Sequence, residues 1–193
     1  MNIKRFILVA LVFLFVFSGY QNLFAKEVAP QARIVLNAWK GLDKDASLYL
    51  RFVFPDIVGS HYPIAWFGFS QKFNKNFTCS VMVGKTLRKE DNTFILSAFP
   101  VFKFGKWSIW NEFDYNFTPK TGYNFTEIRY ATYKDWLKVG IDNENVFGNN
   151  GFISISPAID IVLTDHICIT FSYFFKWVDS ERWEYFRFYL KFF

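Results

Sequence analysis

The sequence has few of the residues on which most catalytic and metal sites are built. Its 193 residues include only two cysteines and two histidines, which stand far apart in the chain. A metal centre needs several such ligands in a close spacing, and the sequence offers none. It also has no glycine-rich loop of the kind that holds a phosphate group. We therefore predict no cofactor and no metal site, and the sequence argues against an enzyme.

Long hydrophobic runs are also scarce, since only one occurs and it lies near the start of the chain. Residues 6–17 are apolar, follow Lys4 and Arg5, and precede small and polar residues that lead to Ala25. This order is typical of a secretory signal peptide. A membrane anchor is the alternative, but a spanning helix needs roughly 20 apolar residues. We predict that residues 1–25 are a signal peptide, cleaved after Ala25, and that the protein is exported.

The cysteines argue against a disulfide-bonded protein, and the basic residues argue against a nucleic-acid-binding protein. Cys79 and Cys168 both lie in apolar runs, far apart in the sequence. A disulfide needs Cα atoms within about 7 Å, which distant strands rarely provide, so two buried free thiols are expected. The net charge is +5, but the lysines and arginines are scattered rather than clustered. The sequence therefore predicts no nucleic-acid binding, and no linker divides the chain after residue 41 into two domains.

Aromatic residues, in contrast, make up 23% of the chain, and they alternate with polar residues. SLYLRFVF (47–54), WSIWNEFDYNF (107–117) and FISISPAIDIVL (152–163) show the pattern. A period of two with aromatic and β-branched residues indicates β-strands. The pattern predicts ten strands: 47–54, 64–73, 77–87, 93–104, 107–117, 123–133, 136–145, 152–163, 167–177 and 183–193.

Alternation does not say which face of the strands points inward. A soluble barrel such as a lipocalin has its apolar face inside, whereas a membrane barrel turns that face to lipid. Three features favour the membrane barrel. The side chains of the apolar face have a larger volume than the interior of a small barrel can hold. Charged residues recur at the middle of the polar face. Aromatic residues are frequent at the strand ends, for example Trp107, Phe117, Tyr123, Trp177 and Trp183. The predicted lumen-lining residues are Arg51, Glu112, Asp114, Glu127, Arg129, Lys138, Asp142 and Glu144.

The connections between the predicted strands fit an antiparallel, up-and-down transmembrane β-barrel, all-β, spanning residues 47–193. One end has very short turns, such as NKN and GK, and the other has longer loops, such as PDIVGSHYP. Residues 26–46 are expected to form a periplasmic or luminal extension. Residues 31–40 have the pattern of an eleventh strand, which has no place in a barrel of ten strands. The alternative is that they form one half of an extra hairpin, whose second strand would bring the total to twelve strands. Pro100 and Pro157 fall inside predicted strands, where bulges are expected.

The chain resembles the small outer-membrane β-barrel proteins of Gram-negative bacteria. The resemblance rests on the export signal, on the alternation over 47–193 and on the closing segment WEYFRFYLKFF, which ends in Phe193. Such barrels typically close with a strand of this kind, read by the barrel assembly machinery. Here the apolar face is Phe186, Phe188, Leu190 and Phe192, one residue out of the usual register. The resemblance implies a bacterial outer-membrane location, with membrane lipids and the assembly machinery as partners.

Three functions follow from this interpretation. The first is a small passive channel, porin-like, which passes small hydrophilic solutes through the charged lumen. The second is a barrel closed by salt bridges inside, which acts through its outer loops as an adhesin or structural component. The third, an envelope-lipid hydrolase, depends on Asp56, Ser60 and His61 in the loop PDIVGSHYP. Because neighbouring residues of an extended loop point to opposite sides, this trio is more simply a set of solvated loop residues. The sequence gives no prediction of whether the protein is a monomer or an oligomer.

Overall fold

The structure, a computed structural model, describes residues 31–55, 62–87, 93–118, 120–133, 135–148, 151–178 and 181–193. The predicted signal peptide lies outside the described residues. Within them all regular structure is β-strand, as predicted. The strands are β1 (Gln31–Gly41), β2 (Ala46–Phe54), β3 (Ile64–Asn74), β4 (Phe77–Thr86), β5 (Phe94–Phe104), β6 (Trp107–Asn116), β7 (Thr121–Tyr133), β8 (Leu137–Phe147), β9 (Phe152–Thr164), β10 (Ile167–Val178) and β11 (Glu181–Phe192).

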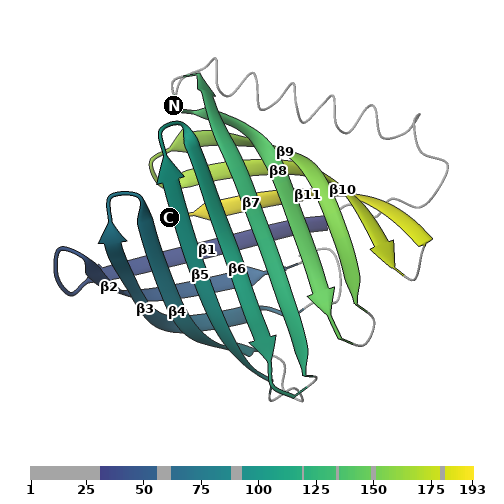
Figure 1. Cartoon of the computed structure of the whole chain (residues 1–193), viewed down its shortest axis with the longest axis horizontal. Coiled ribbons are helices and arrows are strands. Elements are labelled where there is room, and N and C mark those ends of the chain that lie inside the picture. The colour runs from purple at the N-terminus through teal and green to yellow at the C-terminus, as the bar shows by residue number, and fades with distance from the viewer. Residues whose placement is uncertain are drawn as a thin grey trace.

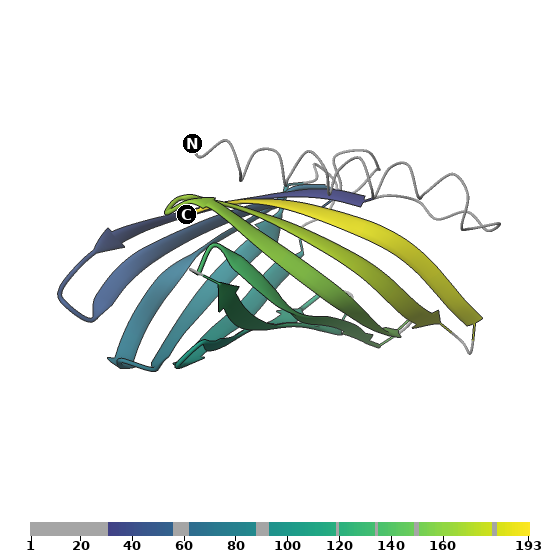
Figure 2. The same cartoon turned by 90° about the horizontal axis from the view of Figure 1, so that it is seen from above.

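The eleven strands form one closed barrel in which neighbours in sequence are neighbours in space. Each strand from β1 to β11 pairs with the next in antiparallel fashion (Figure 1). β1 and β11 then close the barrel by pairing in parallel, from Gln31 opposite Arg187 to Leu36 opposite Phe192. Figure 2 shows this seam, with the purple β1 running beside the yellow β11.

The strand count corrects the prediction of ten or twelve. The ten predicted strands are present to within two residues at each end, and the eleventh is β1, which belongs to the barrel wall rather than to an extension over residues 26–46. An up-and-down barrel with an odd number of strands has its first and last strands pointing the same way. Its closing pair must therefore be parallel. This departs from the even number typical of bacterial single-chain outer-membrane barrels.

Alternation along each strand separates an outer and an inner face. On β11 the buried side chains are those of Tyr185, Arg187, Tyr189 and Lys191, and the intervening Phe186, Phe188, Leu190 and Phe192 are only partly buried. The same rule holds on β4, where Val81 and Val83 are more than half exposed and Met82 is 1% exposed. The apolar residues of most strands thus form the outer surface, and the polar ones face the lumen.

The two prolines within strands do not form the expected bulges. Pro100 pairs with Cys79 of β4, and the pairing of β5 with β6 stops at Ala98 and resumes at Val101 in the same register. Pro157 likewise pairs with Ile141 of β8, and the ladder between β9 and β10 is interrupted beside it without a shift. A proline lacks the N–H that such a ladder needs. Here the missing bond is accommodated by a local gap, so the register is kept.

Aromatic side chains are exposed at several strand ends, as expected for Trp107, Phe117, Trp177 and Trp183, whose exposed fractions range from 40% to 54%. Tyr123 is an exception. Its hydroxyl donates a hydrogen bond of 2.9 Å to Oε1 of Glu144 inside the barrel. The prediction that it lies in an outer girdle is therefore wrong, because Tyr123 falls on the inward face of β7.

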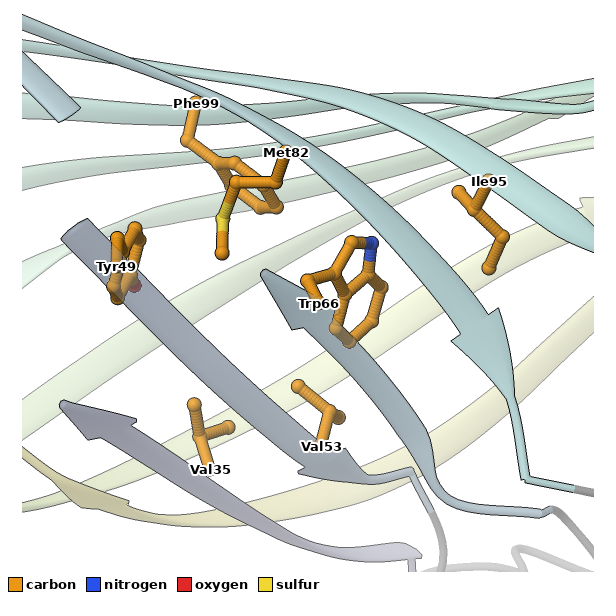
Figure 3. Packing of buried hydrophobic residues seen from close by; sticks show 7 residues of the cluster. All are labelled: Val35, Tyr49, Val53, Trp66, Met82, Ile95 and Phe99. Carbon is orange, nitrogen blue, oxygen red and sulfur yellow. The ribbon is translucent and has the colours of Figure 1, made fainter. Parts of the chain in front are cut away.

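Apolar packing fills part of the interior, chiefly on the wall made by β1–β5. Val35, Tyr49, Val53, Trp66, Met82, Ile95 and Phe99 form one buried cluster (Figure 3). Trp66 is held in place by a hydrogen bond of 2.8 Å from Nε1 to Oγ of Ser97. Gly84 makes room for its indole ring, since a Cβ there would stand 2.4 Å from Cδ1 of Trp66. A second cluster contains Phe125, Phe174, Tyr185 and Tyr189.

Cys79 and Cys168 are free thiols, as expected from their separation in the sequence. Cys79 is on β4 and partly buried, and Cys168 is on β10 and buried. Within the described ranges there is no helix whose length and hydropathy match those of a membrane-crossing helix.

Candidate functional site: the charged lumen

The predicted lumen residues lie on the inward face of their strands, and most of them are deeply buried. Asp142 is fully buried and Glu144 is 2% exposed, while Arg51, Glu112 and Arg129 are 3% to 9% exposed. A central cavity of about 770 Å³ is lined by six of the eight, namely Arg51, Glu112, Asp114, Glu127, Arg129 and Lys138. Asp142 and Glu144, whose exposed fractions are 0% and 2%, do not line the cavity.

Glu144 on β8 is a centre of hydrogen bonding in the lumen. Its carboxylate accepts bonds from Nη2 of Arg33 on β1 at 3.2 Å and from Nη2 of Arg187 on β11 at 2.8 Å. The hydroxyls of Tyr123 and Tyr185 donate to it at 2.9 Å and 3.1 Å. Four donors thus surround one carboxylate that water hardly reaches. This set of contacts joins β8 to both strands of the parallel seam.

Arg129 on β7 forms a second centre, between two carboxylates. Its guanidinium lies 2.6 Å from Oδ1 of Asp142 and 3.0 Å from Oδ1 of Asp160. Ser172 donates a bond of 2.6 Å to Asp142, and Thr170 donates one of 2.8 Å to Asp160. Buried charges are tolerated when they are paired and their remaining oxygens are bonded in this way. The arrangement ties β7, β8, β9 and β10 together from the inside.

Three ion pairs cross the lumen, because each joins strands four places apart in the barrel. They are Arg33 with Glu144, Arg51 with Glu112, and Lys191 with Glu127. In the pair between β2 and β6, the two side chains are 3.4 Å apart. The guanidinium of Arg51 also lies 5.0 Å from the ring centre of Trp110 and 5.4 Å from that of Phe99, within the range of cation–π attraction. These contacts narrow the lumen.

Asp114 and Lys138 differ from the other predicted residues, since neither forms an ion pair within the described part of the chain. Both line the cavity. Oδ1 of Asp114 is a buried oxygen with no hydrogen-bond partner in the described residues. The two side chains are therefore the predicted charges that a solute in the cavity meets without first displacing a salt bridge.

The residues that line the cavity lie near both ends of the barrel as well as at its middle. Near the end with the longer connections its lining includes Pro55, Asn116 and Thr121. Near the end with the short turns it includes Lys103 and Asp165. The lining carries both signs of charge along its length, together with hydroxyl and amide groups such as Ser70, Thr78, Ser80, Ser108 and Asn37.

Sequence reasoning missed four charged residues of the lumen. Arg33 falls in the segment predicted to be a periplasmic or luminal extension rather than a strand of the wall. Arg187 and Lys191 lie on the closing strand, whose register differs from the usual one. Asp160 belongs to the polar face of its strand by alternation but was not included in the predicted set. Each of the four is a charged residue at a position that alternation along its strand places on the inward face. The missing information was which strands lay beside it or across the lumen from it.

The other candidate residues do not form a site in the structure. Asp56, Ser60 and His61 lie outside the described residues. Among the residues that are described, no group of three histidine, cysteine, aspartate or glutamate side chains is placed to hold a metal ion.

Comparisons with known proteins found no match, so the chain is classified by its architecture alone. No protein-family model matches it, no curated protein matches its sequence, and no solved structure matches its fold. The class to which the chain belongs is the closed, mixed β-barrel of eleven strands with charged residues inside and apolar residues outside.

Proposed function

We propose that the protein is an integral membrane β-barrel whose outer surface faces lipid. The proposal is supported by the distribution of side chains, which is the reverse of that in a water-soluble barrel: apolar side chains face outward and charged side chains face inward. The outward positions of β2–β5 include Leu50, Phe67, Phe69, Val81, Val83 and Leu96, each at least 37% exposed. The inward positions carry buried charges. In water such an apolar outer surface would be a large aggregation-prone patch, whereas a bilayer requires it.

The bacterial outer membrane is the location we propose, reached with the predicted signal peptide and inserted by the barrel assembly machinery. This location is supported by the different lengths of the connections at the two ends of the barrel. The connection between β2 and β3 covers residues 55–63, while β3 and β4 are joined by residues 75–76. Short turns on the inner side and longer loops on the outer side are typical of such barrels.

Within this barrel we propose passive transport of small hydrophilic solutes through the lumen. The observation that carries the proposal is the cavity of about 770 Å³, whose lining residues extend from one end of the barrel to the other. Because the lining has both signs of charge, the expected ion selectivity is weak. The pair Arg51 with Glu112 sets a narrow passage, which restricts transport to small solutes.

The second candidate is a closed barrel that acts through its outer loops, and the three ion pairs that cross the lumen favour it. In that case the same charges hold the walls together and the cavity is not continuous. The third function considered, hydrolysis of envelope lipids, has no support from the described residues.

Single-channel recording separates the first two functions. Protein refolded in detergent is added to a planar bilayer, after its heat-dependent gel mobility has confirmed folding. A channel gives discrete, reproducible current steps. In a salt gradient, Lys138→Gln shifts the reversal potential towards cations, because a positive charge of the cavity lining is lost and Lys138 forms no ion pair in the described part of the chain.

The matched control is Lys40→Gln, which removes one positive charge at an exposed side chain outside the cavity lining and leaves the reversal potential unchanged. Folded protein that inserts and carries no current overturns the channel and leaves the closed barrel as the function.

A further inference from the structure

The outer surface of β6–β8 carries a group of four amide side chains and one threonine hydroxyl that stands apart from the apolar surface around it. We call the group the amide patch; it consists of Asn111, Asn124, Thr126, Asn143 and Asn145. These residues alternate with the buried, inward-facing positions of their strands, such as Glu112, Phe125 and Glu144, and therefore lie on the outer face. At the corresponding central outward positions β2, β3, β4 and β5 carry Leu50, Phe69, Val81 and Ala98.

The residues of the patch are joined by hydrogen bonds across all three strands. Asn111 donates to Thr126 at 2.6 Å, Thr126 donates to Asn124 at 3.4 Å, and Asn124 donates back to Asn111 at 2.8 Å. Strand pairing sets this ring, since Asn111 is opposite Thr126. The result is a closed ring of three side chains near the middle height of the barrel.

β8 extends the patch by two further amides. Asn145, opposite Asn124, donates to Asn143 at 2.6 Å and to Asn124 at 3.5 Å. Asn143 donates to the backbone oxygen of Ser154 on β9 at 2.8 Å. Each amide has two N–H donors and an oxygen with two lone pairs, so these bonds leave capacity unused. Asn111, for example, donates only one N–H to a partner among the described residues.

Lipid offers no partner for that unused capacity, because the bilayer core holds no water and no polar groups. If the outer face is in lipid, as proposed above, polar side chains at this depth mark a contact with another protein, since polar groups join membrane segments in this way. The inference therefore rests on the proposed function. The inference goes beyond the proposed function because it identifies a binding partner and the surface that binds it.

We propose that the amide patch is the interface between two copies of this chain in the membrane. An amide is both donor and acceptor, so the patch is complementary to a copy of itself, and it carries no charge that would select a charged partner. Two copies inserted in the same orientation are related by an axis along the bilayer normal. A patch near the strand centres then meets its copy at the same depth. Phe113, Ile141 and Ile155, at 42% to 50% exposure, surround it with apolar surface to pack.

Cross-linking in vesicles tests the interface. In a background with Cys79→Ser and Cys168→Ser, Ile141→Cys places a thiol beside the patch and Val81→Cys places one on β4, a part of the wall outside the patch. With a short bismaleimide at high lipid dilution, the Ile141 variant gives a cross-linked dimer and the Val81 control stays monomeric. Adding Asn111→Leu, Asn124→Leu, Asn143→Leu and Asn145→Leu lowers the dimer yield about tenfold.

Other results overturn the proposal. Equal yields at both positions, no dimer at either, or a yield that the leucine substitutions leave unchanged each show that the patch is not the interface. If the fourfold variant does not fold by gel mobility, the double variant Asn143→Leu with Asn145→Leu replaces it, with the same expected direction. Flotation of the vesicles distinguishes the two failures. Protein that floats with lipid and does not cross-link refutes the dimer alone, whereas protein that does not float refutes the membrane barrel.

Discussion

At the scale of single residues, the lumen contains carboxylates and guanidinium groups that water hardly reaches. Glu144 is the clearest case, with Arg33, Arg187, Tyr123 and Tyr185 all bonded to its two oxygens. A buried ion pair adds little net stability relative to apolar packing, because both charges lose their hydration. Removing one partner is different, since the remaining charge is then buried alone. The lumen should therefore be sensitive to single neutralising substitutions.

Glu144→Gln tests this sensitivity. We expect the free energy of unfolding to fall by about 3 kcal/mol, because Arg33 and Arg187 lose their shared counter-ion in a site that water hardly enters. Urea titration of the refolded protein, followed by tryptophan fluorescence, measures the change. Glu184→Gln is the control: its partner Arg182 has a side chain that is 55% exposed, and we expect a change below about 1 kcal/mol. Equal effects of the two substitutions would contradict the view that burial sets the cost.

At the scale of strands, the barrel depends on β1. Without β1, ten strands would close through β2 and β11, which run in opposite directions. With it, the closing pair is parallel and joins Gln31–Leu36 to Arg187–Phe192. Side-chain contacts reinforce the seam, since Nδ2 of Asn37 donates to the backbone oxygen of Phe192 at 3.0 Å and Nε of Arg187 donates to Gln31 at 2.9 Å. The register of this pair distinguishes the two closures.

A designed disulfide reports that register. In a background with Cys79→Ser and Cys168→Ser, we expect Ala32→Cys with Phe188→Cys to form a disulfide on mild oxidation, because the two residues are directly paired. The matched pair Ala38→Cys with Phe188→Cys should not form one, since Ala38 is six residues further along β1, roughly 20 Å away. Mass spectrometry after proteolysis identifies the bond. Cross-linking of the control pair and not of the first would show a different closure.

At the scale of the whole molecule, the outer surface decides the environment of the barrel. Large apolar side chains are exposed on its outer face, including Phe67 at 57%, Phe113 at 50% and Ile153 at 60%. A protein in water rarely exposes a continuous surface of this kind. The amide patch on β6–β8 is the one feature of the central outer face, among the described residues of β2–β8, that does not fit lipid contact. For that reason we assign it to a protein partner.

A charge at a central outward position tests the environment directly. Val81 on β4 is 55% exposed, so Val81→Arg is harmless on a surface in water. On a lipid-facing surface near the bilayer middle, we expect it to lower folding stability in vesicles by about 2 to 4 kcal/mol. The fraction of folded protein, read from heat-dependent gel mobility over a urea series, measures the effect. Val81→Leu is the control and should leave the midpoint within error, and an equally small effect of arginine would contradict a lipid-facing wall.

How much could be predicted from the sequence depends on how local the information is. Ten strands, their approximate ends and the inward side of most of them followed from alternation, because side chains of a strand point to opposite faces in turn. Tyr123 was placed on the outer face because it is an aromatic residue near a strand end, although alternation turns it inward. The eight predicted lumen residues fell on the inward face for the same reason. The turns and loops also followed, since their lengths are read directly from the chain.

What the sequence by itself determined, then, was the list of strands and the two faces of each, which depend on neighbours along the chain. The tertiary structure alone decided how the list closes and which side chains meet. Arg33 is 111 residues from Glu144 in the sequence and 3.2 Å from it in space, and Asn111, Asn124 and Asn145 form one patch only because three strands pair in a particular register. Pairing of distant strands is fixed by packing and hydrogen bonds across the barrel, and no local pattern in the chain encodes it.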